Sequence, residues 1–291
     1  MFKLQPWRAW FALLMNWVLI TGAFAMAIRF NSWPVYLLAA ALIARTQLAL
    51  AVMMHEAAHW LLTPSRRVND IVGQWFAAGP LCLSLATYRT GHLRHHVDPM
   101  VHDDPVAVIF NITDYPISRR RLLGRLLGDI TGCTYVVGVW KTCCGAYSKL
   151  LATPKSRRLR WFEAVSFLAL NLVMAVALAW HGELMLYLWL WILPSATLLP
   201  LLGRIRAIME HAGFGPDADQ SRNARTIVRP SLQTFFFGPH AIHYHIEHHL
   251  FVRVPFYRLR EVHATLVARH ALPAGNLYKG YGRVLMDVSH H

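Results

Sequence analysis

Charged side chains are scarce in this sequence, and acidic ones are the scarcest. Only 15% of the 291 residues are Asp, Glu, Lys or Arg, against roughly 25% in a typical soluble domain. Lys and Arg number 29 and Asp and Glu number 15, so the formal net charge is +14. Together with 55% hydrophobic residues, this composition excludes a disordered chain and argues against an ordinary soluble enzyme.

Cysteine is also scarce. The chain has four Cys residues and no CxxC pair, which excludes a disulfide framework and a Cys-based zinc site. No Cys-rich iron–sulfur segment and no cytochrome-like haem segment is found in the sequence. Any redox chemistry is therefore expected to take its electrons from a separate protein.

Long apolar runs are present instead. Four windows come close to the roughly 20 apolar residues that a helix needs to cross a bilayer core about 30 Å thick. They cover residues 11–28, 35–54, 165–180 and 184–202. Short turns join the first window to the second and the third to the fourth, which predicts two helical hairpins. We expect an all-α membrane protein with one membrane-embedded domain, in which a helical cap is built from residues 55–160 and 203–291.

The distribution of charge predicts the orientation in the membrane. The two short turns carry at most Arg29, whereas residues 60–160 and 203–291 hold nearly all the remaining Lys and Arg. The positive-inside rule then places the cap and the N-terminus in the cytoplasm. Two further apolar stretches, 71–88 and 130–151, are expected to be re-entrant or interfacial helices. A cleaved signal peptide over the first 27 residues is the alternative for the first window.

Histidine is abundant, and eight of the 17 His residues fall into three clusters with the spacings HxxxH, HxxHH and HxxHH. Residues three and four apart share a helix face, so each cluster points its imidazoles one way. Neutral imidazole is the commonest metal ligand in proteins, and eight exceed the coordination sphere of one ion, so two metal ions are expected. The candidate ligands are His55, His59, His92, His95, His96, His245, His248 and His249.

Two other classes of protein compete for these clusters. The first cluster also reads as HExxH, in which His55 and His59 of a membrane protease would bind Zn and Glu56 would be the general base. That interpretation leaves both HxxHH clusters without a role. A non-enzymatic metal transporter or sensor is the other alternative, although transport favours ligands near the membrane midplane.

The three clusters and their placement around two hairpins resemble those of the membrane-bound fatty acid desaturase superfamily, which includes desaturases, acetylenases, alkane hydroxylases and carotenoid oxygenases. The similarity extends to Tyr88-Arg89-Thr90-Gly91-His92, Asp103-Asp104-Pro105, Asn223-Ala224-Arg225-Thr226 and Val254-Pro255-Phe256-Tyr257-Arg258-Leu259. The resemblance implies an oxidoreductase of lipid metabolism. It implies two Fe ions bound by His, O2 as co-substrate, an external electron donor, and desaturation or hydroxylation of a fatty-acyl or similar amphiphilic substrate.

The resemblance also implies a ninth ligand at the end of the fourth span. Family members have a sequence like Glu-His-x-Gly there, and Glu210-His211-Ala212-Gly213 makes His211 the candidate. Some members carry an Asn four residues before that His, where this chain has Ala207. Members that desaturate near the carboxyl end often begin the third box with Gln, so His245 weakens an assignment to that group.

Further residues are candidates for supporting roles. Arg45 lies within an apolar window, where a charge is costly, and is expected either to contact the substrate or its access path or to bond to a neighbouring helix. Glu56, Glu247 and Asp98 are either hydrogen-bond acceptors for the ligand imidazoles or ordinary surface carboxylates. Seven other histidines are expected at the polar surface: His102, His181, His240, His263, His270, His290 and His291.

The basic charge of the cap suggests two kinds of partner. Arg119, Arg120, Arg121 and Arg125 would attract an acidic ferredoxin-, rubredoxin- or cytochrome-like donor, and anionic membrane lipids account for the same charge. No nucleic-acid partner is expected. The substrate stays open between an acyl chain, a carrier-bound acyl group and a more polar small molecule.

Overall fold

The computed structural model describes residues 3–147, 150–151 and 155–290 and is built mostly from helices. Four helices in these ranges are long and apolar enough to cross a membrane. They are α1 (Pro6–Phe30), α2 (Trp33–Ala58), α8 (Arg157–Trp180) and a continuous helix over Leu184–His211. The last comprises α9 (Leu184–Leu186), the π-helix η4 (Tyr187–Ile192), α10 (Leu193–Ala196) and α11 (Leu198–His211). The predicted all-α membrane class is confirmed.

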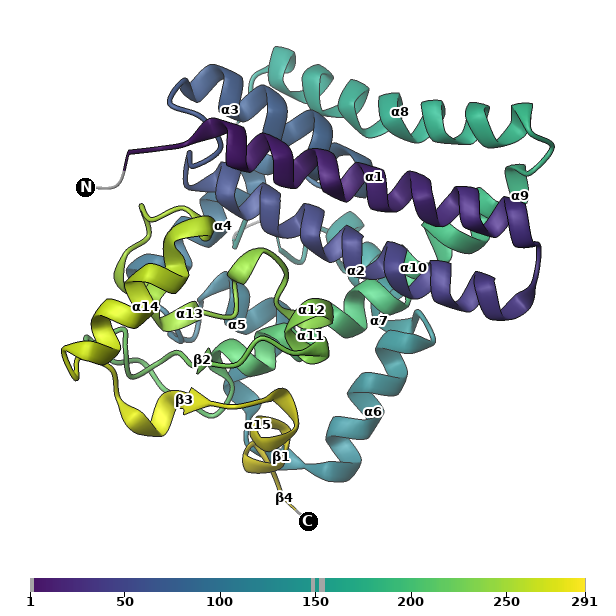
Figure 1. Cartoon of the computed structure of the whole chain (residues 1–291). Coiled ribbons are helices and arrows are strands. Elements are labelled where there is room, and N and C mark those ends of the chain that lie inside the picture. The colour runs from purple at the N-terminus through teal and green to yellow at the C-terminus, as the bar shows by residue number, and fades with distance from the viewer. Residues whose placement is uncertain (1–2, 148–149, 152–154, 291) are drawn as a thin grey trace.

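Tight turns make the two hairpins. α1 ends at Asn31, whose φ of 40° lies in the left-handed region that Asn tolerates, and Pro34 opens α2 at a position where a helix accepts proline. Gly182, with a φ of 76°, makes the turn after α8. Figure 1 shows both hairpin turns at one edge of the molecule and α13 (His245–Leu250) and α14 (Leu259–Ala268) at the opposite edge, beside the N-terminus.

The helices extend further than the apolar windows indicated. α2 continues through His55 to Ala58, and the fourth span continues to His211. In both helices the polar residues at the end are buried in the protein interior, so they fit a helix that is no longer surrounded by lipid. Gly213, at a φ of 81°, then turns the chain away from α11.

The first stretch expected to be interfacial forms three short segments, α3 (Arg66–Gly73), the π-helix η1 (Gln74–Ala78) and η2 (Gly79–Leu81). They pack against α8, where a Cβ on Gly79 would lie 2.7 Å from the carbonyl oxygen of Ser166. The next helix along the chain is α4 (Leu85–Val97).

The second stretch, 130–151, was expected to hold an interfacial helix, and it contains the shorter helix α7 (Cys133–Cys143). α6 (Arg119–Ile130) and α7 (Cys133–Cys143) meet there at an angle of 76°, and residues 148–149 lie outside the described ranges. The break falls at Gly132, whose φ of 80° is left-handed and interrupts the helix.

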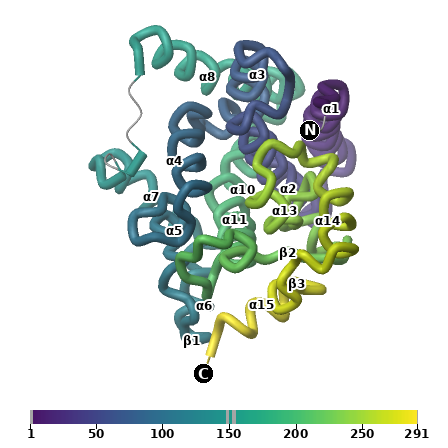
Figure 2. Tube along the Cα trace, turned by 90° about the vertical axis from the view of Figure 1, so that its left-hand side faces the viewer, coloured from purple at the N-terminus to yellow at the C-terminus, as the bar shows by residue number. Residues whose placement is uncertain are grey.

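The cap is assembled from short helices and two pairs of parallel strands. β1 (Ile117–Ser118) pairs with β4 (Ser289–His290), and β2 (Thr226–Ile227) pairs with β3 (Leu277–Tyr278). Figure 2 shows α4, α13 and α11, the last part of the fourth span, around the middle of the molecule. The other cap elements are α5 (Pro105–Phe110), η3 (Ile112–Asp114), α12 (Leu232–Phe237), η5 (Pro239–Ala241), η6 (Phe256–Arg258), η7 (Ala274–Asn276) and α15 (Tyr281–Asp287).

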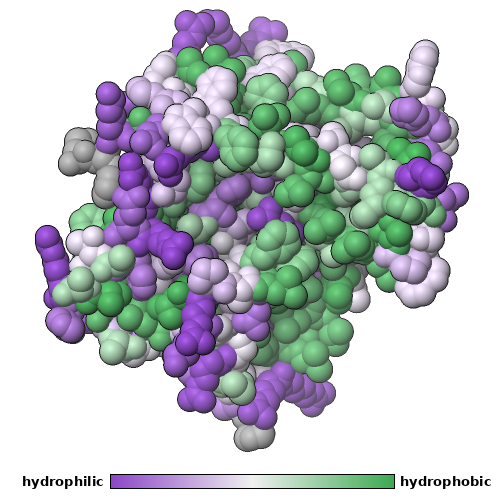
Figure 3. Space-filling view, viewed as in Figure 1, coloured by the Kyte–Doolittle hydropathy of each residue, from purple (hydrophilic) through white to green (hydrophobic). Residues whose placement is uncertain are grey.

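Apolar side chains are exposed along the spans, as lipid contact requires. Leu168, Leu172 and Val176 follow one another along a face of α8 and are exposed. In Figure 3 hydrophobic residues cover the region of α1 and α2, and hydrophilic residues gather toward α14 and α15. The surface thus indicates an integral membrane protein. On α1, Trp17 donates a hydrogen bond of 3.0 Å to the carbonyl of Phe76, which joins α1 to η1.

Candidate metal centre

Nine buried histidines converge on the interior ends of the spans, each at most 8% exposed. They are the eight cluster histidines and His211, and they form two groups in which the candidate ligand atoms lie within 4.8 Å of one another. The five-histidine group consists of His55, His59, His92, His96 and His248. The four-histidine group consists of His95, His211, His245 and His249.

Helical spacing divides the two HxxHH clusters between the groups. On α4, His92 and His96 are four residues apart and share a face. Each residue advances about 100° around a helix, so His95 points about 60° away from His92 and about 100° away from His96. α4 therefore supplies two imidazoles to the five-histidine group and one to the other. On α13 the same geometry sends His248 to the five-histidine group and the pair His245 and His249 to the four-histidine group.

The distances between Nε2 atoms match those within one coordination shell. In the five-histidine group the Nε2 atoms of His59 and His92 are 2.8 Å apart, and those of His55 and His248 are 2.9 Å apart. Neighbouring ligands of an octahedral ion with metal–nitrogen bonds of about 2.1 Å lie about 3.0 Å apart. The donor set and its spacing therefore fit a bound transition-metal ion.

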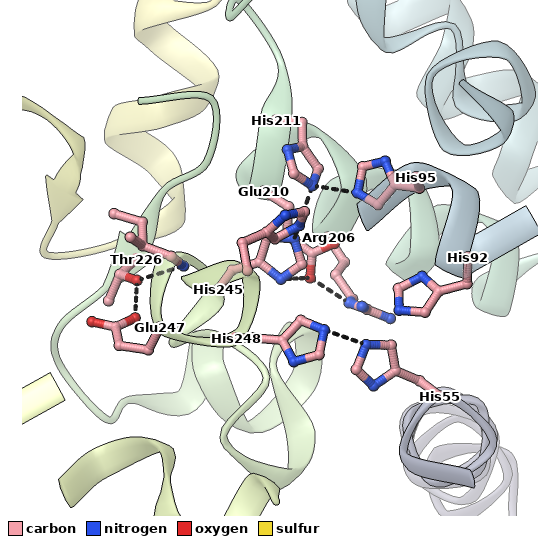
Figure 4. A network of polar contacts seen from close by, with 12 residues as sticks. His55, His92, His95, Arg206, Glu210, His211, Thr226, His245, Glu247 and His248 are labelled. Atoms are coloured by element: carbon pink, nitrogen blue, oxygen red, sulfur yellow. Dashed lines mark hydrogen bonds and ion pairs between the residues drawn. The ribbon is translucent and has the colours of Figure 1, made fainter. Parts of the chain in front are cut away.

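The four-histidine group has the same spacing and is centred on His211. Its Nε2 atom lies 2.8 Å from that of His245 and 3.2 Å from that of His95. Figure 4 shows His211 and His95 on one side of the network and His248 and His55 on the other, with His245 between them. Each group thus offers enough imidazoles for one ion.

Polar groups hold two rings of the four-histidine group by their outer nitrogen, Nδ1. Asp104 Oδ2 lies 2.8 Å from His95 Nδ1, and the Asn223 carbonyl oxygen lies 2.8 Å from His211 Nδ1. Glu210 Oε1 lies 3.5 Å from His245 Nδ1, an ion-pair contact without a hydrogen bond. A hydrogen bond at Nδ1 fixes the ring and directs Nε2 inward. Sequence reasoning noted the motifs that contain Asp104 and Glu210 but did not assign them this role.

The carboxylates that were proposed for that role behave differently from one another. Glu56 Oε1 is 3.4 Å from His55 Nδ1, but the two atoms form no hydrogen bond, so the role of Glu56 as an acceptor stays a prediction. Asp98 is exposed, and Glu247 contacts Thr226 and His263 instead of a cluster histidine.

Burial favours the neutral form of His59 and His96. It lowers the pKa of His59 to about 4 and that of His96 to about 2, with neighbouring positive charge adding to the shift. The pKa of Asp104 is lowered overall. Its burial raises the pKa, but the hydrogen bonds from His95 and from two backbone N–H groups outweigh that effect. At neutral pH His59 and His96 are therefore neutral imidazoles, the form that binds a metal, and Asp104 is an ionised carboxylate.

Two histidines expected at the surface are partly buried and hydrogen-bonded. The ring of His240 lies 3.0 Å from the Asn16 amide nitrogen, and His263 Nδ1 lies 2.5 Å from Glu247 Oε1. His102, His181, His270 and His290 are exposed, as expected, and His291 lies outside the described residues.

Arg45 is buried at the interface between α2 and α12. Its Nε atom donates a hydrogen bond of 3.0 Å to the carbonyl oxygen of Phe235, and the guanidinium lies 4.5 Å from the centroid of the Phe235 ring. This contact is the structural bond that was one of its two expected roles. Contact with a substrate stays a prediction.

Comparison with known proteins identifies the family. The model of the fatty acid desaturase family matches residues 31–281. The chain belongs to the fatty acid desaturase family. A curated relative, dihydrorhizobitoxine desaturase from Bradyrhizobium elkanii, is 26% identical over 255 residues, which cover 83% of this chain and 70% of the relative.

Membership of the fatty acid desaturase family weighs against the protease alternative, and so does the position of Glu56. This carboxylate is buried, and its Oε2 atom accepts a hydrogen bond of 3.0 Å from the backbone N–H of Phe256. A general base must face a water on the metal, whereas Glu56 faces the backbone of another segment.

Proposed function

We propose that the protein is an O2-dependent oxidoreductase that desaturates or hydroxylates an unactivated C–H position of a fatty-acyl or similar amphiphilic substrate, with one Fe ion in each histidine group. The observation that carries the proposal is the pair of adjacent buried groups of imidazoles in a desaturase-family chain. Iron and O2 would supply the oxidant for hydrogen abstraction, which is beyond any side-chain acid or base.

The residues of the chain have three tasks in this proposal. The nine imidazoles hold the ions through Nε2. Asp104, Glu210 and the Asn223 carbonyl orient the rings of the four-histidine group. Buried apolar residues such as Ile208 and Ile246, both 0% exposed, keep bulk water away from the ligands and so protect a reactive centre from side reactions.

Two comparisons indicate the class of substrate. The family favours an acyl chain, and the curated relative is named for dihydrorhizobitoxine. Arg45 is retained as a candidate substrate-contacting residue, because an ionisable side chain within a span is costly. Desaturation and hydroxylation diverge only after the first hydrogen abstraction, so the position of the substrate would decide between them.

The electron donor and the sidedness belong to the proposal as well. Arg119 and Arg120 at the start of α6 are exposed, and they suit an acidic ferredoxin-, rubredoxin- or cytochrome-like protein or anionic lipid headgroups. The cap lies opposite both hairpin turns (Figure 1), and the positive-inside rule would place it and the N-terminus in the cytoplasm.

Two measurements test the function. Protein purified after expression in iron-replete medium should contain close to two Fe per chain by elemental analysis. Mass spectrometry of extracts from cells with and without the gene should reveal a product two hydrogens lighter, or one oxygen heavier, than its precursor. A single Zn without iron would contradict the proposal and favour the protease.

A further inference from the structure

A guanidinium reaches the histidine groups from α11. Figure 4 shows Arg206 extending past Glu210 toward His92, between the two groups. Its charge acts on His245, whose pKa is lowered first by burial, then by His249 and His211, and also by Arg206. A permanent positive charge beside two sites for metal cations is unfavourable unless anions compensate it.

Glu210 supplies one compensating anion. Arg206 Nε donates a hydrogen bond of 2.6 Å to Glu210 Oε1, one helical turn along α11. The same oxygen lies 3.5 Å from His245 Nδ1, so Glu210 is shared between the guanidinium and a candidate ligand. One carboxylate thus faces several positive or electron-withdrawing groups, which leaves the local charge positive once metal is bound.

The pairing through Nε leaves the outer end of the guanidinium available. Nη1 and Nη2 of Arg206 donate no hydrogen bond to any residue that the structure describes, and the side chain is 16% exposed. These two N–H groups form a planar fork whose geometry matches the two oxygens of a carboxylate. The fork therefore has the charge, geometry and access that a carboxylate ligand requires.

Beside Arg206 lies an internal cavity of about 10 Å³, which has room for about one water molecule. Its polar lining consists of Arg206, Glu210, Arg225, His243, His245 and Tyr281. A ligand body does not fit there. The guanidinium itself is directed toward His92, between the two histidine groups where C–H oxidation is proposed to occur (Figure 4).

We propose that Arg206 binds a free carboxylate of the substrate through Nη1 and Nη2, so that the oxidised carbon lies only a few bonds from that carboxylate. The substrate class is then a free carboxylic acid, in contrast to an acyl group held in a thioester or ester, which carries no negative charge. This inference deepens the proposed function and rests on it for the reaction type.

Binding of simple probes to the iron-loaded protein in a non-ionic detergent tests the proposal. Calorimetric titration should give hexanoate an affinity at least tenfold higher than methyl hexanoate, because the ester has no charge for the fork. Hexadecanoate and its methyl ester form the second arm, which separates a small acid from a long-chain free fatty acid. Equal affinity for acid and ester in both arms would overturn the proposal.

Variants at Arg206 separate substrate binding from a role in positioning Glu210. Arg206→Gln should lose the preference for the acid while iron content stays near that of the parent. Arg206→Lys keeps the charge without the fork and should retain part of the preference, which keeps the test available if the Gln variant does not fold. Loss of iron together with the preference would assign Arg206 to positioning Glu210 and overturn the proposal.

Arg204 provides a matched control on the same helix. It is ion-paired like Arg206, but it is buried, its partner is Asp129, and it also donates to the carbonyl of Phe110. Arg204→Lys should lower thermal stability and leave the preference for hexanoate intact. Desaturation of an ester or a carrier-bound acyl group without any dependence on Arg206 would overturn the carboxylate proposal and leave the proposed function standing.

Discussion

The two histidine groups differ in what holds their imidazoles in place. In the four-histidine group, His95 and His211 are fixed at Nδ1 by Asp104 and by the Asn223 carbonyl. In the five-histidine group no Nδ1 atom forms a hydrogen bond within the described residues, and the nearest carboxylate contact joins His55 to Glu56 at 3.4 Å. Two of the four imidazoles in the first group are thus oriented by polar partners, whereas the second group depends on the packing of α2, α4 and α13.

This difference indicates that the two groups are not interchangeable. Four ligands leave more of a metal ion's coordination shell open than five do, and Arg206 with Glu210 lies beside the four-histidine group. A negative partner at Nδ1 also makes an imidazole a stronger ligand. The four-histidine group should therefore tolerate the loss of a ligand or of a polar partner less well.

The largest effect is expected from His211→Ala. His211 contacts both His95 and His245, so its removal leaves three ligands and a buried void. Turnover should fall at least about 100-fold, and iron should decrease from about two to about one per chain by elemental analysis. His102→Ala, at a histidine whose side chain is 95% exposed, is the control. Equal iron and activity in both variants would remove His211 from the ligand set.

Asp104→Asn should have the next largest effect. The amide keeps the size of the side chain but removes the negative charge beside His95, and changes of this kind typically lower metal affinity or activity by about 10- to 100-fold. Iron retention during titration with a chelator and the rate of product formation are the measurements. Asp98→Asn, at an exposed carboxylate just after α4, should change neither. An Asp104→Asn protein with parental iron retention would show that both groups are held by packing alone.

The sequence predicted the ligands better than their grouping. The spacing of His92, His95 and His96 is local and visible in the chain, and so are the two hairpins. Which imidazole joins which group depends on how α2, α4, α11 and α13 cross, and no short motif contains that information. Asp104 reaches His95 from a loop nine residues further on, and the Arg206–Glu210 pair stands out only when His245 is placed beside it.

The stability of the metal-free protein should depend on pH in a defined window. Unfolded histidine has a pKa of about 6.5, and burial lowers the folded values of His59 and His96 to about 4 and about 2. Below pH 6.5 the unfolded chain binds more protons than the folded one, so the free energy of unfolding falls as the pH falls from 6.5 toward 4. Above pH 7 neither state binds these protons, and stability should not change on their account.

Thermal unfolding of chelator-treated protein between pH 5 and pH 8 measures this dependence. We expect the Tm to decrease by several degrees from pH 7 to pH 5 and to recover on return to neutral pH. Re-loading with iron should make the decrease steeper, because protons then also compete with the metal. A Tm that stays constant down to pH 5 would mean that the imidazoles are hydrated in the metal-free state and not buried as a group.

The smallest and most discriminating effect concerns Arg45, which lies on α2 ten residues before His55 and thus about 15 Å from it along the helix. Its Nε–H bond to the Phe235 carbonyl explains a structural role, and loss of such a charged hydrogen bond costs about 1.5–3 kcal/mol. If Arg45 also contacts the substrate, Arg45→Met should raise KM several-fold or shift the position of oxidation, with iron content unchanged. A purely structural role lowers Tm and leaves KM and product as in the parent. Steady-state kinetics and product analysis on folded, iron-loaded Arg45→Met protein decide between the two roles. A parental KM with the parental product would end the substrate-contact hypothesis. Substrate recognition would then be assigned to the side of the four-histidine group.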